Sequence, residues 1–411
     1  MASVLDTVMY DLKEFYTVKY VEEAIFKDRP LFGLMPKDNR FEGKSLPIPI
    51  ITGRPQGISQ TFSAAQAAAA TGTSGAEFFI TQSLQYGISQ IPNQVIQNTK
   101  SDMGSFFRYL TKTIDLNMDQ FAYTVAWKMF GDGYSVLGVV STITGTGPYT
   151  ITLTNQIDSY KFAVNQQIVS STAISGTAPT NLMTVTSVDY NSGVITVSLV
   201  SGTAPAANAY LFINGDYSTT LNSPAGLYGL GSWIPDSAPG STPFFGVDRT
   251  TNPVALAGTR YNALGAPIEE AILDLVTAVA SNGFGVPTHV VMNNYKLAEL
   301  VKSLQSRRAY VQIDEKGKLT EGEVFFKSVL VQTPFGDVKV IHDRNCPINK
   351  FYALKLDDWT LYSNGGVPRV FDTDGFDMLR VYNQDAIEFR CFAFMQLACH
   401  NPGASGVGFF S

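Results

Sequence analysis

The sequence predicts an α+β protein that carries an inserted all-β module. Three observations support this fold class. Residues 101–130 have the pattern of one long amphipathic helix, and residues 138–215 have the composition of short strands and turns. Residues 268–397 then mix helical stripes with antiparallel strands. A chain of 411 residues has room for roughly two or three domains with cores of their own.

The composition favours a subunit of an assembly. Hydrophobic residues make up 45% of the chain and charged residues only 16%, whereas about a quarter is usual for charged residues in globular proteins. A chain short of charge leaves apolar surface exposed, so neighbouring molecules are expected to cover that surface. The net charge of −6 gives no general attraction for nucleic acid or acidic membranes.

The cysteines and the N-terminal residues indicate a reducing compartment. Cys346, Cys391 and Cys399 show no CxxC spacing and no neighbouring histidine cluster, so the sequence predicts buried thiols and no zinc site. Residues 1–15 lack the basic start and apolar core of a signal peptide, and no apolar run reaches membrane-spanning length. We therefore expect a soluble protein, made in a cytoplasm, with no membrane partner.

The first hundred residues predict an arm and a long hairpin. The arm holds one helix, about Leu12–Phe26, and little core of its own. In a strand over residues 46–50, Pro47 and Pro49 remove N–H donors from the same edge, so only the other edge can pair. The expected partner is one strand over residues 76–91. Its apolar face would comprise Phe78, Ile80, Leu84, Tyr86 and Ile88.

The hairpin tip, residues 57–75, is rich in Ala, Ser, Thr and Gly. A disordered surface loop is its plainest interpretation. However, two strands of about ten residues each project well beyond a local core, and an isolated two-stranded hairpin is marginally stable in water. We therefore expect the apolar face of the hairpin to be buried against another element, such as one on another subunit.

Residues 101–130 predict a helix roughly 45 Å long. Thr99 or Ser101 can cap its start, and Gly131 and Gly133 follow its end. Lys, Asp and Gln interrupt the heptad pattern, which argues against a coiled coil. One face is apolar: Met103, Phe106, Phe107, Leu110, Ile114, Met118, Phe121, Val125 and Met129.

Residues 138–215 contain five or six short strands, with a turn at 191–193 between two of them, and predict a small barrel or sandwich. After a proline-rich stretch, a helical stripe runs from Pro267 to Gly283. A buried strand at 288–292 and a second helix capped by Asn293 or Asn294 follow. The later predicted strands are 329–332, 338–342, 351–356, 359–362, 378–382 and 386–397.

No motif for catalysis, cofactor binding or metal binding emerges. His289, His342 and His400 lie near no nucleophile in sequence, so we interpret them as structural or surface residues. No nucleophile elbow or phosphate loop occurs. Residues 372–377 resemble a fragment of a calcium loop without its distal glutamate, and an Asp- and Gly-rich turn is the plainer interpretation. We therefore predict no catalytic, cofactor or metal site and no enzyme.

The order of these parts resembles the major capsid proteins of tailed bacteriophages, which share the Hong Kong 97 fold. Local phrases are also similar to that family. They are Phe62-Ser-Ala-Ala-Gln at the hairpin tip, Pro287-Thr-His-Val-Val-Met-Asn293 before a helix, Asp343-Arg-Asn-Cys-Pro347 after a strand, and Asp374-Gly375 before the closing strands.

The resemblance implies an icosahedral, self-assembling shell around double-stranded DNA, built from hexamers and pentamers. It also implies a portal protein and non-specific contact with the packaged DNA. The domains it implies are an N-arm (1–45), an E-loop (46–97), a peripheral domain with the spine helix (98–137), the inserted module (138–215), a mostly axial domain (216–375) and peripheral closing strands (376–411).

Two departures from the family pattern modify these expectations. Some relatives cross-link subunits through an E-loop lysine, but residues 52–99 contain Arg54 as their one basic residue, so this cross-link is not expected. The chain also begins close to its arm, so scaffolding is expected from a separate protein. The inserted module could contact neighbours or bind a decoration (cement) protein. Another virion subunit, such as a tail-tube or fibre protein, is the alternative, and a hydrolase using His289 or His342 is a third hypothesis.

Overall fold

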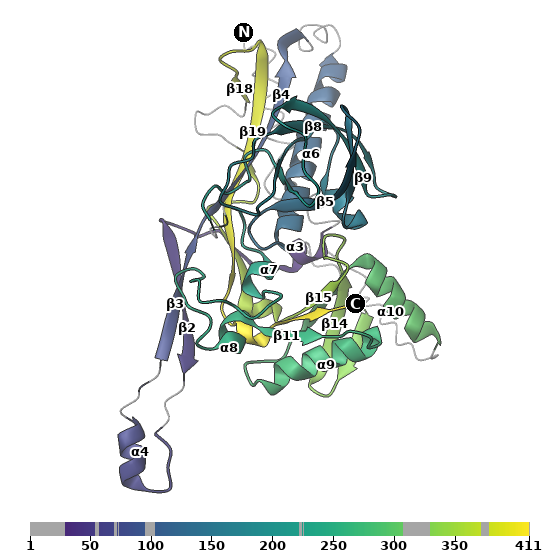
Figure 1. Ribbon diagram of the computed structural model, residues 1–411. Coiled ribbons are helices and arrows are strands. Elements are labelled where there is room, and N and C mark those ends of the chain that lie inside the picture. Colours follow the sequence, from purple (N-terminus) through teal and green to yellow (C-terminus); the bar gives the residue numbers. More distant parts are fainter. Residues whose placement is uncertain are drawn as a thin grey trace. The chain divides into compact units, whose positions relative to one another are not determined.

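A computed structural model gives the fold of the chain (Figure 1). It describes residues 29–53, 57–69, 72, 74–94, 103–221, 224, 226–306, 329–370 and 378–410. The arm helix predicted at 12–26 and the acidic turn predicted at 372–377 lie outside these residues. The chain forms two compact units, Trp127–Trp233 and the remainder, Met1–Ala126 with Ile234–Ser411. Each is described on its own.

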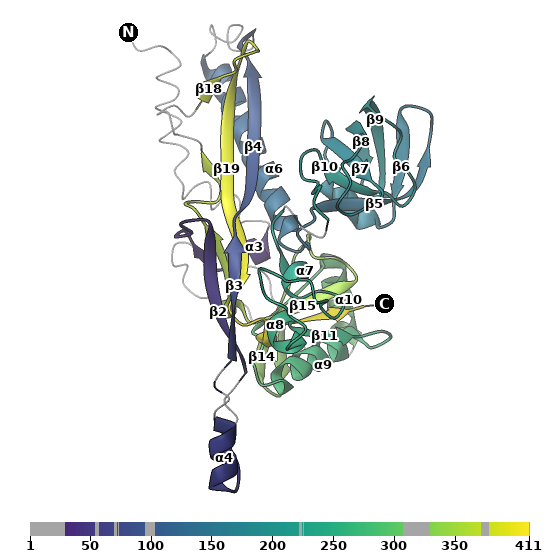
Figure 2. The same ribbon diagram turned by 60° about the vertical axis from the view of Figure 1, so that its left-hand side comes forward.

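A sheet in the larger unit is organised around β19 (Ala386–Cys399), a strand of 14 residues. β4 (Ser83–Pro92) pairs with it antiparallel over ten residues without a register shift, and the two strands run side by side in Figures 1 and 2. The strands on the opposite edge of β19 are β16 (Trp359–Ser363), β17 (Arg369–Val370) and β18 (Met378–Arg380), and β1 (Lys37–Asp38) joins β16 in parallel.

The long helix α6 (Met103–Lys128) covers the inner face of β4 and β19. Its described apolar residues Ile114, Met118, Phe121 and Val125 are buried, as the helical stripe predicts. The side chains of residues 103–111 are not among the described ones. The Cys391 thiol donates to the Asn117 side-chain oxygen at 3.2 Å, which joins the helix to the sheet.

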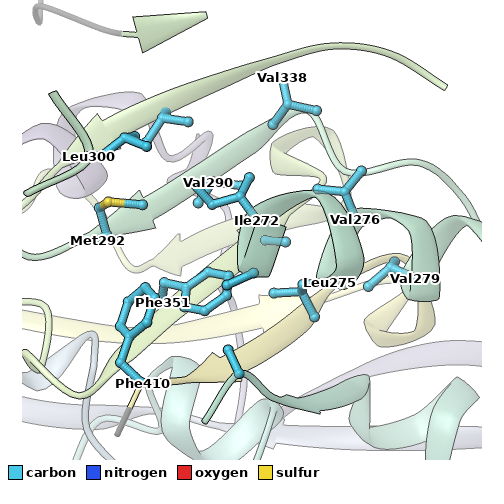
Figure 3. Packing of buried hydrophobic residues seen from close by; sticks show 14 residues of the cluster. Ile272, Leu275, Val276, Val279, Val290, Met292, Leu300, Val338, Phe351 and Phe410 are labelled. Atoms are coloured by element: carbon cyan, nitrogen blue, oxygen red, sulfur yellow. The ribbon is translucent and has the colours of Figure 1, made fainter. Parts of the chain in front are cut away.

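A second sheet forms the α/β part of the larger unit. α9 (Ile268–Ser281) lies along it with its predicted stripe buried, and α10 (Asn294–Ser306) adds Leu300 to the same core (Figure 3). The Phe351 and Phe410 rings stack at 4.6 Å within this core. The strand order is β11 (Thr259–Asn262), β20 (Gly406–Phe409), β15 (Lys350–Leu354), β12 (His289–Met292), β14 (Gly336–His342) and β13 (Val329–Thr333).

The smaller unit contains the predicted barrel. Six strands close on themselves, and their alternate residues, among them Val140, Ile151 and Met183, fill the interior with no exposed surface. This confirms the inserted β module. The barrel order is β10 (Tyr210–Ile213), β5 (Val136–Thr144), β6 (Tyr149–Leu153), β9 (Val194–Ser201), β8 (Leu182–Asp189) and β7 (Gln167–Ser171).

Short helices complete the described elements. In the larger unit they include α3, which packs its first three residues into the core, and α4, which lies between β2 and β3 along the chain. The short helices are α3 (Pro30–Leu34), α4 (Phe62–Ala69), α7 (Leu230–Trp233), α8 (Pro253–Ala257) and the 3₁₀ turns at Gln156–Lys161, Leu356–Asp358 and Pro402–Ala404.

The hairpin differs from its prediction in two ways. Among the described strands, β2 (Ser45–Gly53) pairs with β3 (Ser74–Thr81) alone, because the strand is interrupted at Gln82 and the chain continues as β4 on β19. Phe78 and Ile80 are buried, whereas Leu84, Tyr86 and Ile88 are exposed, so the predicted single apolar face was wrong. β3 and β4 have different neighbours, and the alternation of apolar residues along the sequence cannot show where one strand ends and the next begins.

Two further predictions need correction. Residues 62–69 form α4 instead of a disordered loop, since alanine has the highest intrinsic helix propensity and five of these eight residues are alanine. The strands predicted at 351–356 and 359–362 do not continue one sheet. The 3₁₀ turn Leu356–Asp358 redirects the chain, so β15 and β16 belong to different sheets.

Candidate assembly surfaces

The base of the β2–β3 hairpin is anchored on a loop with two adjacent phenylalanines. The fully buried Phe78 ring meets the edge of Phe244 at 6.1 Å, and the backbone N–H of Phe79 donates to the carbonyl of Phe245 at 3.0 Å. The guanidinium of Arg249 lies 4.0 Å from the centre of the Phe244 ring. Burial, and secondarily the nearby Arg260, lowers the pKa of Arg249 to about 10. The base of the hairpin, which we call the root, is therefore packed against its own protomer.

The outer edge of β2 lacks backbone donors where its prolines lie. Phe79 stands opposite Pro47 in the ladder, and its N–H points away from β2 towards Phe245. The two residues are thus a non-hydrogen-bonded pair, in which both backbones face outward. Pro49, two residues on, has the same orientation. The edge offers carbonyls without matching N–H groups there, which protects it against strand addition, as the sequence predicts.

The tip of the hairpin is apolar and is not buried by the described parts of its own protomer. No residue of α4 is buried, and the side chains of Ile58 and Phe62 are 88% and 82% exposed. Residues 57–69 carry no charge. In both views of the larger unit α4 lies beyond the ends of β2 and β3 (Figures 1 and 2). Large apolar side chains at this exposure mark a contact surface when they cluster.

A second exposed apolar surface lies on the outer face of the β4–β19 pair, opposite the face covered by α6. Leu84, Tyr86 and Ile88 are 56, 56 and 55% exposed. Across the ladder Tyr86 stands opposite Phe392, and its ring meets Phe394 edge-on at 6.0 Å. Five apolar side chains thus form one patch, which we call the outer-sheet patch: Leu84, Tyr86, Ile88, Phe392 and Phe394.

The described chain begins at a tightly held junction. Arg29, largely buried, pairs with Asp119 of α6 at 2.6 Å. The buried carboxylate of Asp343 accepts from the backbone N–H of Leu31 at 3.3 Å and from that of Asn345 at 2.8 Å. Burial raises the pKa of Asp343 to about 6, although these hydrogen bonds and the charge of Arg29 oppose the increase. The segment that leads out of the arm is therefore fixed to both α6 and the second sheet.

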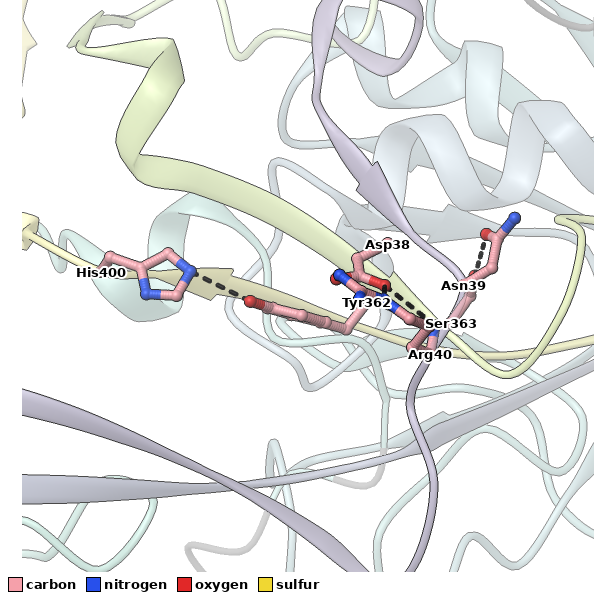
Figure 4. Close-up of polar contacts among 6 residues, drawn as sticks. All are labelled: Asp38, Asn39, Arg40, Tyr362, Ser363 and His400. Atoms are coloured by element: carbon pink, nitrogen blue, oxygen red, sulfur yellow. Dashed lines mark hydrogen bonds and ion pairs between the residues drawn. The ribbon is translucent and has the colours of Figure 1, made fainter.

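Beyond α3 the chain joins the edge of the first sheet through polar contacts (Figure 4). Arg40 forms an exposed ion pair with Asp38 at 3.0 Å, and the Ser363 hydroxyl donates to the Asn39 side-chain oxygen at 3.0 Å. The Tyr362 hydroxyl and the Nε2 atom of His400 lie 3.1 Å apart. The Ser363–Asn39 hydrogen bond, together with the pairing of β1 and β16, fixes the start of the hairpin on β16.

The histidines considered for chemistry lie apart from one another. His289 shares a hydrogen bond with the adjacent Thr288 hydroxyl at 2.9 Å, and burial together with Lys339 lowers its pKa. His342 ends β14, and His400 contacts Tyr362. Among the residues that the structure describes, no group of three or more His, Cys, Asp or Glu side chains could hold a metal ion.

The three cysteines are buried free thiols, and burial raises their pKa values. Within the described parts of the chain, no helix combines the length and the apolar character needed to cross a membrane. Sequence reasoning missed the Asp343 junction and the Phe244–Phe245 root. The adjacent phenylalanines in a proline-rich loop were the available signal for the root.

Comparisons with known proteins agree with this architecture. Residues 208–375 match the family model described as SU10 major capsid protein. The capsid asymmetric unit of cyanophage A-1(L) is similar, with a TM-score of 0.52, 12% identity, and coverage of 93% of this chain and 92% of that one. This similarity shows the shared fold. No curated protein sequence matches.

Other solved structures align with lower TM-scores. An encapsulin complex from Synechococcus elongatus has a TM-score of 0.44 at 8% identity, covering 93% of this chain and 86% of that one. A protein of Mycobacterium phage Ogopogo has a TM-score of 0.42 at 12% identity, covering 94% of this chain and 93% of that one. The match over residues 208–375 to a major capsid protein family, and the fold shared with a cyanophage capsid, show that the chain has the capsid fold predicted from its sequence, the Hong Kong 97 fold.

Proposed function

We propose that copies of this chain form an icosahedral head shell around double-stranded DNA, held together by the hairpin and the arm of each copy reaching over its neighbours. Hexamers and pentamers would be the units of the shell. The proposed parts are the N-arm (1–45), the E-loop (46–97), the peripheral domain with α6 (98–137), the barrel module (138–215), the mostly axial domain (216–375) and the peripheral closing strands (376–411).

The observation that carries this proposal is the contrast between the root and the tip of the hairpin. The root is packed, with Phe78 fully buried, whereas Ile58 and Phe62 at the tip are almost fully exposed. Each of these tip side chains would gain about 1.5–3 kcal/mol on full burial. A single contact of this size is weak, but every copy makes several, and closure of a shell multiplies them.

The proposed partners follow from this role. A portal protein would occupy one vertex, a separate scaffolding protein would guide assembly, and a decoration protein could bind the outside. The acidic balance of −6 suits DNA that is pumped into the shell, because the wall itself would not attract the phosphate backbone. The protein would be made in the cytoplasm of the host bacterium and would act structurally, without catalysis.

Deletion of residues 57–74 tests the proposal. We expect the purified variant to keep nearly the same helix content by circular dichroism but to lose closed particles in sedimentation and negative-stain electron microscopy. A milder variant, Ile58→Ser with Phe62→Ser, should reduce particle yield in the same direction. The matched control, Val164→Ser with Val200→Ser, removes two exposed apolar side chains from the barrel module.

Normal yield and stability of particles from the deletion variant would contradict the role of the hairpin. Tubes or fibres formed by the wild-type protein would contradict the closed shell and favour a tail-tube or fibre subunit.

A further inference from the structure

The outer edge of β4 is long, regular and uncharged. None of its ten residues, Ser83–Pro92, is charged, and its ladder with β19 contains no bulge. Within the described part of the chain, β19 is the one strand that pairs with β4. Such an edge is a template for pairing with another chain unless it is short, charged, bulged or covered.

The backbone groups that face outward can be assigned from neighbouring hydrogen bonds. The N–H of Asn93 donates to the carbonyl of Asp385 at 2.9 Å, so odd-numbered residues of β4 face β19. On the far side of β19, the carbonyl of Phe394 accepts from Asn364 at 2.9 Å. Phe394 therefore faces away from Leu84, its partner in the ladder. Leu84, Tyr86, Ile88 and Gln90 consequently direct their N–H and carbonyl groups outward.

The chain protects a comparable edge elsewhere. Pro47 and Pro49 remove outward donors from β2, whereas β4 has no proline before Pro92, which occupies the next outward position after Gln90. Unpaired backbone groups that become buried cost about as much as a lost hydrogen bond each. An uncovered edge within an assembly would therefore be unfavourable, and a paired one would contribute a row of hydrogen bonds.

We propose that β4 pairs antiparallel with β4 of a second copy across a two-fold axis at Gly87. This register alone pairs all four outward residues with one another: Tyr86 with Ile88 of the partner subunit, and Leu84 with Gln90 of the partner subunit. If the axis passed through Tyr86 or Ile88 instead, one of the four outward-facing residues would stand opposite a partner residue that is not one of these four. Because the strand carries no charge, self-pairing places no like charges across the axis.

The side chains of β4 also favour a second copy of the chain as the pairing partner. Outward residues of β4 belong to the exposed face of the sheet, so pairing joins the outer-sheet patches of the two copies. Tyr86 would lie beside Ile88 of the partner subunit, an aromatic–β-branched pair of the kind that stabilises sheets. An isologous contact of this type closes on itself, because the same patch serves both copies. This inference deepens the proposed shell by specifying one contact between its subunits.

Disulfide trapping tests the register. The variant Tyr86→Cys with Ile88→Cys places each new cysteine opposite one of the partner subunit, at about 5.5 Å between Cα atoms, within the range for a disulfide. The matched control, Leu84→Cys with Tyr86→Cys, brings cysteines together only diagonally, at about 7–8 Å. After mild oxidation we expect a covalent dimer on a non-reducing gel from the first variant and at least tenfold less from the second.

The covalent dimer is measured both in assembled particles and in protein that remains free in solution. Intact particles with no dimer, or with equal dimer from both variants, would overturn the β4 pairing and leave the shell standing. Dimer from the first variant without closed particles would support the pairing and count against the shell. A second variant, Ile88→Pro, removes one outward donor without touching the ladder to β19, and it should lower particle yield at least severalfold, whereas unchanged yield would contradict the pairing.

Discussion

The carboxylate of Asp343 accepts a hydrogen bond from the backbone N–H of Leu31 across 312 positions of sequence. It lies at the end of the second sheet and is 1% exposed, so the start of the described chain is tied to a buried, ionisable group. Two ionisable groups lie near Asp343. Arg29 favours the ionised carboxyl, and the carboxylate raises the pKa of the buried Cys346 thiol further than burial alone does.

This junction makes stability depend on pH. Because the folded-state pKa of Asp343, about 6, lies above the ordinary value of 3.8, its contribution to stability is complete below about pH 4 and is lost as pH rises through 6. The difference corresponds to about 3 kcal/mol. We expect the Asp343→Asn variant to gain about this much relative to wild type between pH 4 and pH 7.5. Urea unfolding of unassembled protein at several pH values measures it.

The exposed Asp337→Asn variant is the control for the pH experiment, since its side chain lies on the surface of the second sheet. Its free energy of unfolding should run parallel to that of wild type. If the Asp343→Asn curve ran parallel as well, the carboxyl would not titrate in the folded protein in the way its burial implies.

Gly87 is required by the close approach of α6 to the sheet. A Cβ atom there would lie 2.7 Å from the Cys391 sulfur and 2.9 Å from the Asn117 side-chain oxygen. Gly87→Ala should therefore destabilise the protein by about 1–3 kcal/mol through overpacking. Gly240→Ala is the control, because a Cβ atom at that position meets nothing within 4 Å. Thermal unfolding compares the two, and equal transition temperatures would show that α6 shifts at no cost.

The hairpin root offers a test by double-mutant cycle. Phe78→Ala should cost about 3–5 kcal/mol, because it empties a fully buried site. Phe79→Ala, at a side chain that is 49% exposed, should cost much less. Since the rings of Phe78 and Phe244 meet, the effects of Phe78→Ala and Phe244→Ala should be non-additive by about 0.5–1.5 kcal/mol. Strict additivity of the unfolding free energies would exclude a direct contribution from this ring pair.

Elements with local patterns were predictable from sequence, and contacts between distant segments were not. The stripe of α9 and the alternation of the barrel strands depend on neighbours close in sequence, so periodicity suffices. Phe78 and Tyr86 share one alternation, but Phe78 meets a loop near residue 244 and Tyr86 belongs to a strand paired with residues near 390. No spacing within residues 76–91 distinguishes these environments.

The same limit applies to the candidate surfaces. The sequence identified the hairpin and its protected edge, because a proline removes the backbone donor at its own position. It did not identify the outer edge of β4, since the direction of each backbone group depends on the register with β19, about 300 residues further along the chain. The role of Asp343 depends on Leu31, which is equally remote.

The barrel should be separable from the rest of the chain. Its first and last strands pair with each other, with Val136 opposite Phe212, so the entry and exit of the module are adjacent. Their Cα atoms are about 5 Å apart, as in any antiparallel pair, and a short Gly-Ser linker can replace residues 137–211. Because the barrel encloses its own core, we expect the shortened chain to keep its α6 and α9 helix signal by circular dichroism. The excised residues 134–214 should unfold cooperatively by themselves, and aggregation of both products would show that the module and the remainder need each other to fold.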